Sequence, residues 1–99
     1  MKYVILTIVI RREGDYYVSK CVELGTASFG STKEEAVVRV RDAVELHLNT
    51  LEDLGECEAA LKAKGIRVHQ SDEAAAHEVK FPSRGSTVYS QVMPLRAAC

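Results

Sequence analysis

Apolar and polar positions along the first thirty residues predict three short β-strands. The stretch 2–11 is rich in β-branched side chains, and both of its alternating faces are largely apolar, which favours a central strand. A Glu-Gly-Asp turn at 13–15 and a turn at Gly25 separate it from two further strand-like stretches, 16–23 and 26–29. Because these connections are too short for parallel crossovers, we predict a three-stranded antiparallel meander.

A long amphipathic helix is predicted directly after the third strand. Thr32 with Glu35 has the spacing of a capping box, and Ser31 with Glu34 offers the same device one residue earlier. Apolar side chains then recur every three or four residues and form one stripe. The stripe consists of Val37, Val40, Val44, Leu48 and Leu51. We expect this helix to end at Gly55 and to pack on the meander.

The rest of the chain predicts smaller elements. Residues 56–64 favour a short second helix, and 66–68 favour a brief strand. Turn residues occur over 82–85, and 87–95 has the alternation of a last strand that Pro94 ends or places at a sheet edge. This last strand either pairs within its own chain or adds to the sheet of another subunit.

These elements predict one α+β domain over residues 1–99. Its β-β-β-α core spans 1–54, and a short helix with terminal strands follows over 55–99. One layer of helix covers only one face of a sheet. We therefore expect the second apolar face of the first strand to be covered by a folded-back tail or by a second subunit, and we predict a homodimer or larger homo-oligomer.

Composition and charge indicate a soluble domain without the basic surface that binding of DNA or RNA needs. Hydrophobic residues make up 46% of the chain and charged residues 27%, which excludes a disordered chain. Thirteen basic and fourteen acidic residues give a net charge of −1, so we predict no autonomous binding to DNA or RNA. One acidic stretch is a candidate surface for a basic partner. It comprises Glu52, Asp53, Glu56 and Glu58.

The cysteines, the histidines and the apolar amino-terminal run bear on compartment and metal binding. The cysteines and histidines do not follow a common zinc-ligand spacing, so we expect no metal site. These residues are Cys21, Cys57, Cys99, His47, His69 and His77. An odd number of cysteines predicts no disulfide framework and favours ordinary thiols in a reducing compartment. The run at 4–10 has no cleavage site and is too short to span a bilayer, which predicts a cytoplasmic protein.

The sequence contains no pattern of residues that is typical of a catalytic site. A metal-dependent nuclease of the ribonuclease-H type needs several converging carboxylates that typically begin in the first strand, and 2–11 contains no acid. The acidic residues of the long helix are explained by its surface and its first turn. No nucleophilic triad and no phosphate-binding glycine loop is present in the sequence. We predict no enzyme, no catalytic residue and no cofactor; a nuclease remains a testable alternative.

The aromatic and histidine side chains are expected to serve structure. We expect Phe29 in the core and His47 partly buried on the helix surface. Tyr3, Tyr16 and Tyr17 have an alternative role as stacking platforms for RNA bases. Without surrounding basic residues, cross-strand pairing is the favoured interpretation of these tyrosines.

Three segments in the first half of the chain resemble a known family. Residues 14–24, GDYYVSKCVEL, are similar to the pattern G-x-Y-x-A-x-x-P-E-L, with Val22 in place of the proline. Residues 28–36, SFGSTKEEA, are similar to S-x-G-x-T-x-E-E-A, and residues 42–48, DAVELHL, to E-A-I-E-L-Y-L. In this combination and order, the chain resembles the HicB-like antitoxins over residues 1–54.

The resemblance implies both a fold and a function. The fold is a partial ribonuclease-H-like unit, in which a helix lies across a meander. The implied function is that of an antitoxin, a protein-binding module that covers a small RNA-cleaving HicA-type toxin by steric occlusion. The final forty residues show no amphipathic helix pair, so we expect a short form without a DNA-binding segment. The alternative is an orphan non-catalytic domain of the same fold with a structural or small-ligand role.

Overall fold

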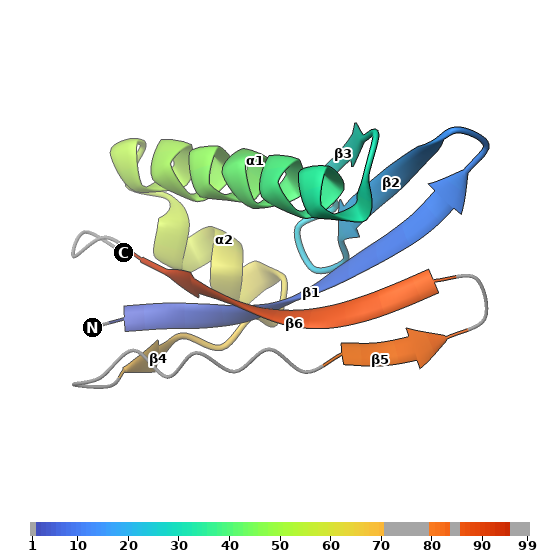
Figure 1. The fold of residues 1–99 in the computed structure, drawn as a ribbon. Coiled ribbons are helices and arrows are strands. Elements are labelled where there is room, and N and C mark those ends of the chain that lie inside the picture. The colour runs from blue at the N-terminus through green and yellow to red at the C-terminus, as the bar shows by residue number, and fades with distance from the viewer. Residues whose placement is uncertain (1, 71–79, 84–85, 96–99) are drawn as a thin grey trace.

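The computed structural model describes residues 2–70, 80–83 and 86–95. These residues form an antiparallel sheet with two helices on one of its faces (Figure 1). The strands are β1 (Lys2–Glu13), β2 (Tyr16–Cys21), β3 (Ala27–Gly30), β4 (His69–Gln70), β5 (Lys80–Ser83) and β6 (Ser86–Pro94). The helices are α1 (Lys33–Asp53) and α2 (Cys57–Ala63). The predicted α+β class, with its meander, long helix, short second helix and terminal strands, is confirmed.

The meander forms because a two-residue turn joins β1 to β2. Gly14 has a φ of 61°, a left-handed conformation that glycine adopts without steric cost, and the register places Glu13 opposite Tyr16. β3 then pairs antiparallel with the other side of β2. The three strands follow the predicted order, although β1 continues two residues further, to Glu13, and β2 ends two residues earlier, at Cys21.

The carboxy-terminal strand β6 pairs with β1 of the same chain. Its register runs from Tyr3 opposite Pro94 to Arg11 opposite Ser86. The strand order is β3-β2-β1-β6-β5, and β4 pairs with the start of β1. β6 therefore lies inside the sheet, and of the two pairings that the sequence left open the structure has the intramolecular one.

Two predicted details of the carboxy-terminal part differ from the structure. The brief strand expected at 66–68 is displaced to His69–Gln70. Pro82 lies within β5 and not in a turn, while the rest of the expected turn, at 84–85, falls outside the described residues. Pro94 is the last residue of β6, which agrees with the prediction that this proline ends the last strand.

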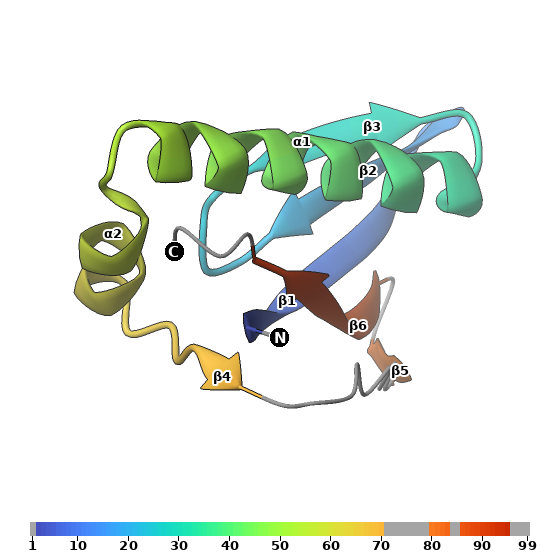
Figure 2. The ribbon, with the colours of Figure 1, turned by 90° about the vertical axis from the view of Figure 1, so that its left-hand side faces the viewer.

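The core lies between the helices and one face of the sheet. The even-numbered residues from Val4 to Ile10 are buried against the apolar stripe of α1. The short helix α2 lies at one end of this layer (Figure 2). The buried side chains at the centre are Val4, Leu6, Ile8, Ile10, Val40, Val44, Leu48, Cys57 and Leu61. Burial of each large aliphatic side chain contributes roughly 1.5–3 kcal/mol. The predicted amphipathic stripe of α1 is thus confirmed in its central positions.

Three contacts fix the start of α1 on the meander. Thr32 caps the helix, and its hydroxyl accepts the backbone N–H of Glu35 at 3.1 Å. The buried Ser19 hydroxyl of β2 donates to the carbonyl oxygen of Ala36 at 2.8 Å. Gly30 has no side chain, which lets the backbone of the first helical turn approach β3 closely. These contacts hold α1 over β2 and β3, and no helix of the described residues lies on the opposite face of the sheet.

Candidate functional site

The face of the sheet opposite the helices is largely apolar and is left uncovered by the described residues. Ile5 lies opposite Val92, and Val9 lies opposite Val88, so these side chains share this face. Ile5 is 41% exposed, whereas its neighbours Val4 and Leu6 are fully buried on the other face. We call this surface the open face. Its apolar and aromatic side chains among the described residues are Tyr3, Ile5, Val9, Tyr16, Val18, Phe29, Val88 and Val92.

The position of Phe29 corrects a prediction from the sequence. Phe29 was expected in the core, but it is 59% exposed. It pairs with Val18, which in turn pairs with Arg11 of β1, so all three belong to the face opposite the core. Because β3 is an edge strand, the Phe29 ring still reaches Arg39 of α1. The strand alternation, which the long-range register determines, places this ring on the open face. His47 is likewise exposed and not partly buried.

The charged groups of the open face balance one another. Arg11 forms an ion pair with Glu13. The Glu23 carboxylate accepts the backbone N–H of Thr7 at 2.8 Å and the Thr7 hydroxyl at 2.9 Å. The Glu23 carboxylate therefore provides a hydrogen-bond acceptor for the β1 backbone at Thr7, beyond the end of β2. Together with Lys20, which shares this face with Val9, the open face carries two positive and two negative side chains.

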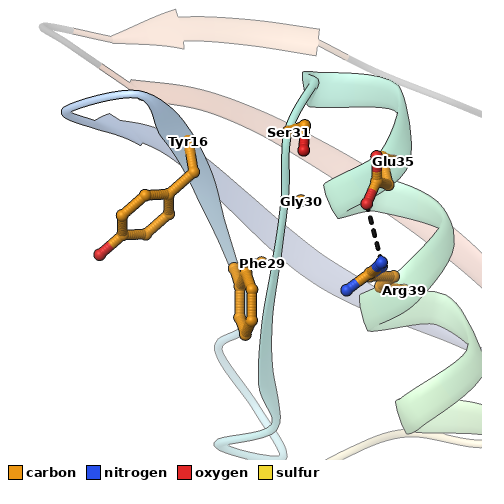
Figure 3. Close-up of a pocket in the computed structure, with 6 residues that line it drawn as sticks. All are labelled: Tyr16, Phe29, Gly30, Ser31, Glu35 and Arg39. Carbon is orange, nitrogen blue, oxygen red and sulfur yellow. Dashed lines mark ion pairs between the residues drawn. The ribbon is translucent and has the colours of Figure 1, made fainter.

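A cavity of about 310 Å³ lies between β3 and the first turns of α1 (Figure 3). Its lining residues are Tyr16, Phe29, Gly30, Ser31, Glu35 and Arg39. We call it the β3 cavity. The Arg39 guanidinium lies 2.9 Å from the Glu35 carboxylate and 5.8 Å from the centre of the Phe29 ring. Because its two charges already pair with each other, the cavity suits an uncharged, flat or apolar group.

The β3 cavity was missed by sequence reasoning. Glu35 was predicted only as a capping residue, and no functional role was predicted for Arg39. Their spacing of four residues on a helix was the available signal for an ion pair. The two rings of the cavity, 6.0 Å apart in an edge-to-face arrangement, come from different strands. Their meeting depends on the pairing of β2 with β3.

The four predicted partner-binding acids lie at the junction of α1 and α2. Glu52 and Asp53 are in the last turn of α1, Glu56 is the N-cap of α2, and Glu58 is in its first turn. Glu52 is only 6% exposed and lies on the buried side of α1, whereas the other three are exposed. The exposed part of the acidic stretch is therefore Asp53, Glu56 and Glu58, which we call the acidic junction.

The two cysteines that the structure describes, Cys21 and Cys57, differ in whether they form a disulfide bond. Cys21 is free and buried, and burial raises the pKa of its thiol. Cys57 is disulfide-bonded. The expectation of unpaired thiols is thus wrong for Cys57, since an odd cysteine count excludes complete pairing but allows one bridge.

The part of the chain that the structure describes contains no group of three or more His, Cys, Asp or Glu side chains close enough to hold a metal ion. Neither α1 nor α2 combines the length and hydropathy of a membrane-spanning helix. Three surfaces of the described residues are candidates for function: the open face, the β3 cavity and the acidic junction.

Comparison with known proteins adds no family assignment. No family model matches the chain, and neither a curated protein nor a solved structure does. Over the residues that the structure describes, the chain is an α+β domain whose sheet has one face covered by helices and one apolar face that these residues leave open.

Proposed function

We propose that the chain is an antitoxin-like protein-binding module that neutralises a small RNA-cleaving toxin of the HicA type by steric occlusion. The observation that carries this proposal is the acidic junction, because its three exposed carboxylates offer complementary charge to a protein that binds RNA. The segments that resemble the HicB-like family also form the meander and the helix that the resemblance implies. The function is non-catalytic and belongs in the cytoplasm, where such a toxin meets its RNA.

The acidic junction is the proposed contact with the toxin. A protein that cleaves RNA needs cationic side chains on its active surface to bind the phosphate backbone. The exposed carboxylates of Asp53, Glu56 and Glu58 offer the complementary charge. Glu52 belongs to the same stretch but is buried, so it does not present its carboxylate to a partner. Steric occlusion requires only that this contact cover the RNA-binding surface.

The test is inhibition of RNA cleavage in a purified mixture. We expect a small toxin-like protein to be encoded beside this chain, and we expect the chain to co-purify with that protein and to inhibit it stoichiometrically. The double charge reversal Glu56→Lys and Glu58→Lys should weaken inhibition strongly at low salt and less at high salt. The matched control reverses Asp42 and Glu45 on the exposed surface of α1 and should leave inhibition unchanged. Absence of any complex with the neighbouring gene product would overturn the proposal.

The second candidate function is that of an orphan domain that binds a small ligand. The β3 cavity favours it, because two rings and an internally neutral ion pair surround a volume of about 310 Å³. A fragment screen by NMR should then shift the resonances of Tyr16 and Phe29, and Arg39→Ala should remove the effect. Binding of fragments without toxin inhibition would favour this function. We expect no RNA cleavage by the chain alone with Mg²⁺ or Mn²⁺, and cleavage would establish the nuclease alternative.

A further inference from the structure

We propose that the open face is the interface of a two-fold symmetric homodimer, in which the sheets of two copies stack with their helices on the outside. Pairing with β6 extends the sheet beside β1 but does not cover the second face of β1. The side chains Ile5, Val9, Val88 and Val92 therefore still lack a covering layer among the described residues. This inference does not depend on the existence of a toxin.

The size of the open face fits a second copy. Strand residues rise by about 3.3 Å and strands lie about 4.8 Å apart, so the six strands present a face of roughly 600 Å². Two such faces bury about 1,200 Å² in total, which is the lower end of the range for specific, stable interfaces. Two twisted sheets stack about 10 Å apart with their side chains interdigitated. A dimer of this size is expected to dissociate on dilution.

The charge of the open face also favours a second copy over a cationic partner. Its four charged side chains balance, with Arg11 paired to Glu13 and the Glu23 carboxylate bound to Thr7. A two-fold interface places a patch against itself, so any net charge would be doubled and repulsive. A neutral, apolar patch avoids that repulsion, whereas a toxin that binds RNA would find its complement at the acidic junction.

Exposed apolar side chains on α1 form a contrasting surface. Val38 and Leu46 are exposed, Leu46 at 68%, but charged residues separate them on the helix. Isolated apolar residues of this kind are ordinary on protein surfaces and do not form an interface. Leu46 thus provides a matched control, because it is more exposed than Ile5 and lies on the other side of the sheet.

The experiment measures the molar mass of the full chain by light scattering and sedimentation over a wide concentration range. We expect the mass to rise from 10.9 kDa toward twice that value as the concentration increases. Ile5→Glu should weaken association by more than about 100-fold, because two-fold symmetry buries the introduced carboxylate twice. Leu46→Glu should leave association unchanged. A chain that stays monomeric at every concentration overturns the proposal.

A conservative variant keeps the test valid if Ile5→Glu does not fold, which circular dichroism would show. The double variant Ile5→Thr and Val92→Thr keeps β-branched side chains in the strands and reduces the apolar area of the open face. It should weaken association by about tenfold or more, since several methyl groups are lost from each copy. Association that survives both open-face variants, or that Leu46→Glu abolishes, would place the interface elsewhere and overturn the proposal.

Discussion

Substitution of Gly30 by alanine tests whether close backbone approach positions α1 on the sheet. Gly30 ends β3, and a Cβ atom added there would lie 2.7 Å from the backbone nitrogen of Ala36. The same atom would lie 2.9 Å from the carbonyl carbon of Glu35. Both neighbours are backbone atoms of the first helical turn, which cannot rotate away as a flexible side chain would. The turn must therefore move by several tenths of an ångström.

Whether Gly30→Ala raises or lowers the free energy of unfolding distinguishes two physical explanations. Gly30 is not among the glycines with positive φ, so its backbone does not itself exclude alanine. An argument from unfolded-state entropy alone predicts stabilisation by about 0.4–1 kcal/mol. Overpacking costs about 1–3 kcal/mol. Displacement of the first turn also strains the Ser19 bond to the Ala36 carbonyl, worth about 1 kcal/mol. We expect a net destabilisation of about 2–3 kcal/mol.

Urea unfolding followed by circular dichroism provides the measurement. With a slope of about 1–3 kcal/mol per molar urea, Gly30→Ala should lower the midpoint by about 1–2 M and leave the slope unchanged. The neighbouring exposed Ser31 provides the control, because Ser31→Ala should change stability by less than about 0.5 kcal/mol. A Gly30→Ala midpoint equal to or above that of the parent chain would refute the reasoning.

Three further predictions concern single contacts. Ser19→Ala leaves the buried carbonyl oxygen of Ala36 without its donor and should cost about 1–3 kcal/mol in urea unfolding; an unchanged midpoint would mean that the bond contributes nothing. Thr32→Ala removes the cap of α1 and should cost about 1 kcal/mol, with Thr32→Ser largely restoring it in thermal melts. The raised pKa of the buried Cys21 thiol predicts slow reaction with thiol reagents in the folded chain. Because the folded pKa lies above the unfolded one, this group's contribution to stability is present below the ordinary thiol pKa and is lost as the pH rises through the folded value, which unfolding at neutral and alkaline pH would reveal.

Elements governed by neighbouring residues were predictable from the sequence. The cap at Thr32, the turn at Gly14 and the stripe through Val40, Val44 and Leu48 each depend on residues within one or two turns of chain. Local backbone preference and side-chain period decide such features before any distant contact forms. The acidic stretch was also visible in the sequence, but its exposure was not, because Glu52 turned out to lie on the buried side of α1.

Features that depend on distant residues were decided only by the tertiary structure. The alternation in 2–11 showed that the first strand has two apolar faces, but only the pairing of Tyr3 with Pro94 showed that the chain's own last strand lies beside it and not across it. The same long-range register turned Phe29 outward and brought it to Arg39 in the β3 cavity. Side chains alternate between the two faces along a β-strand, so the sequence alone tells which residues share a face. Which face the helices cover, and which face stays open, depends on how strands far apart in the chain pair.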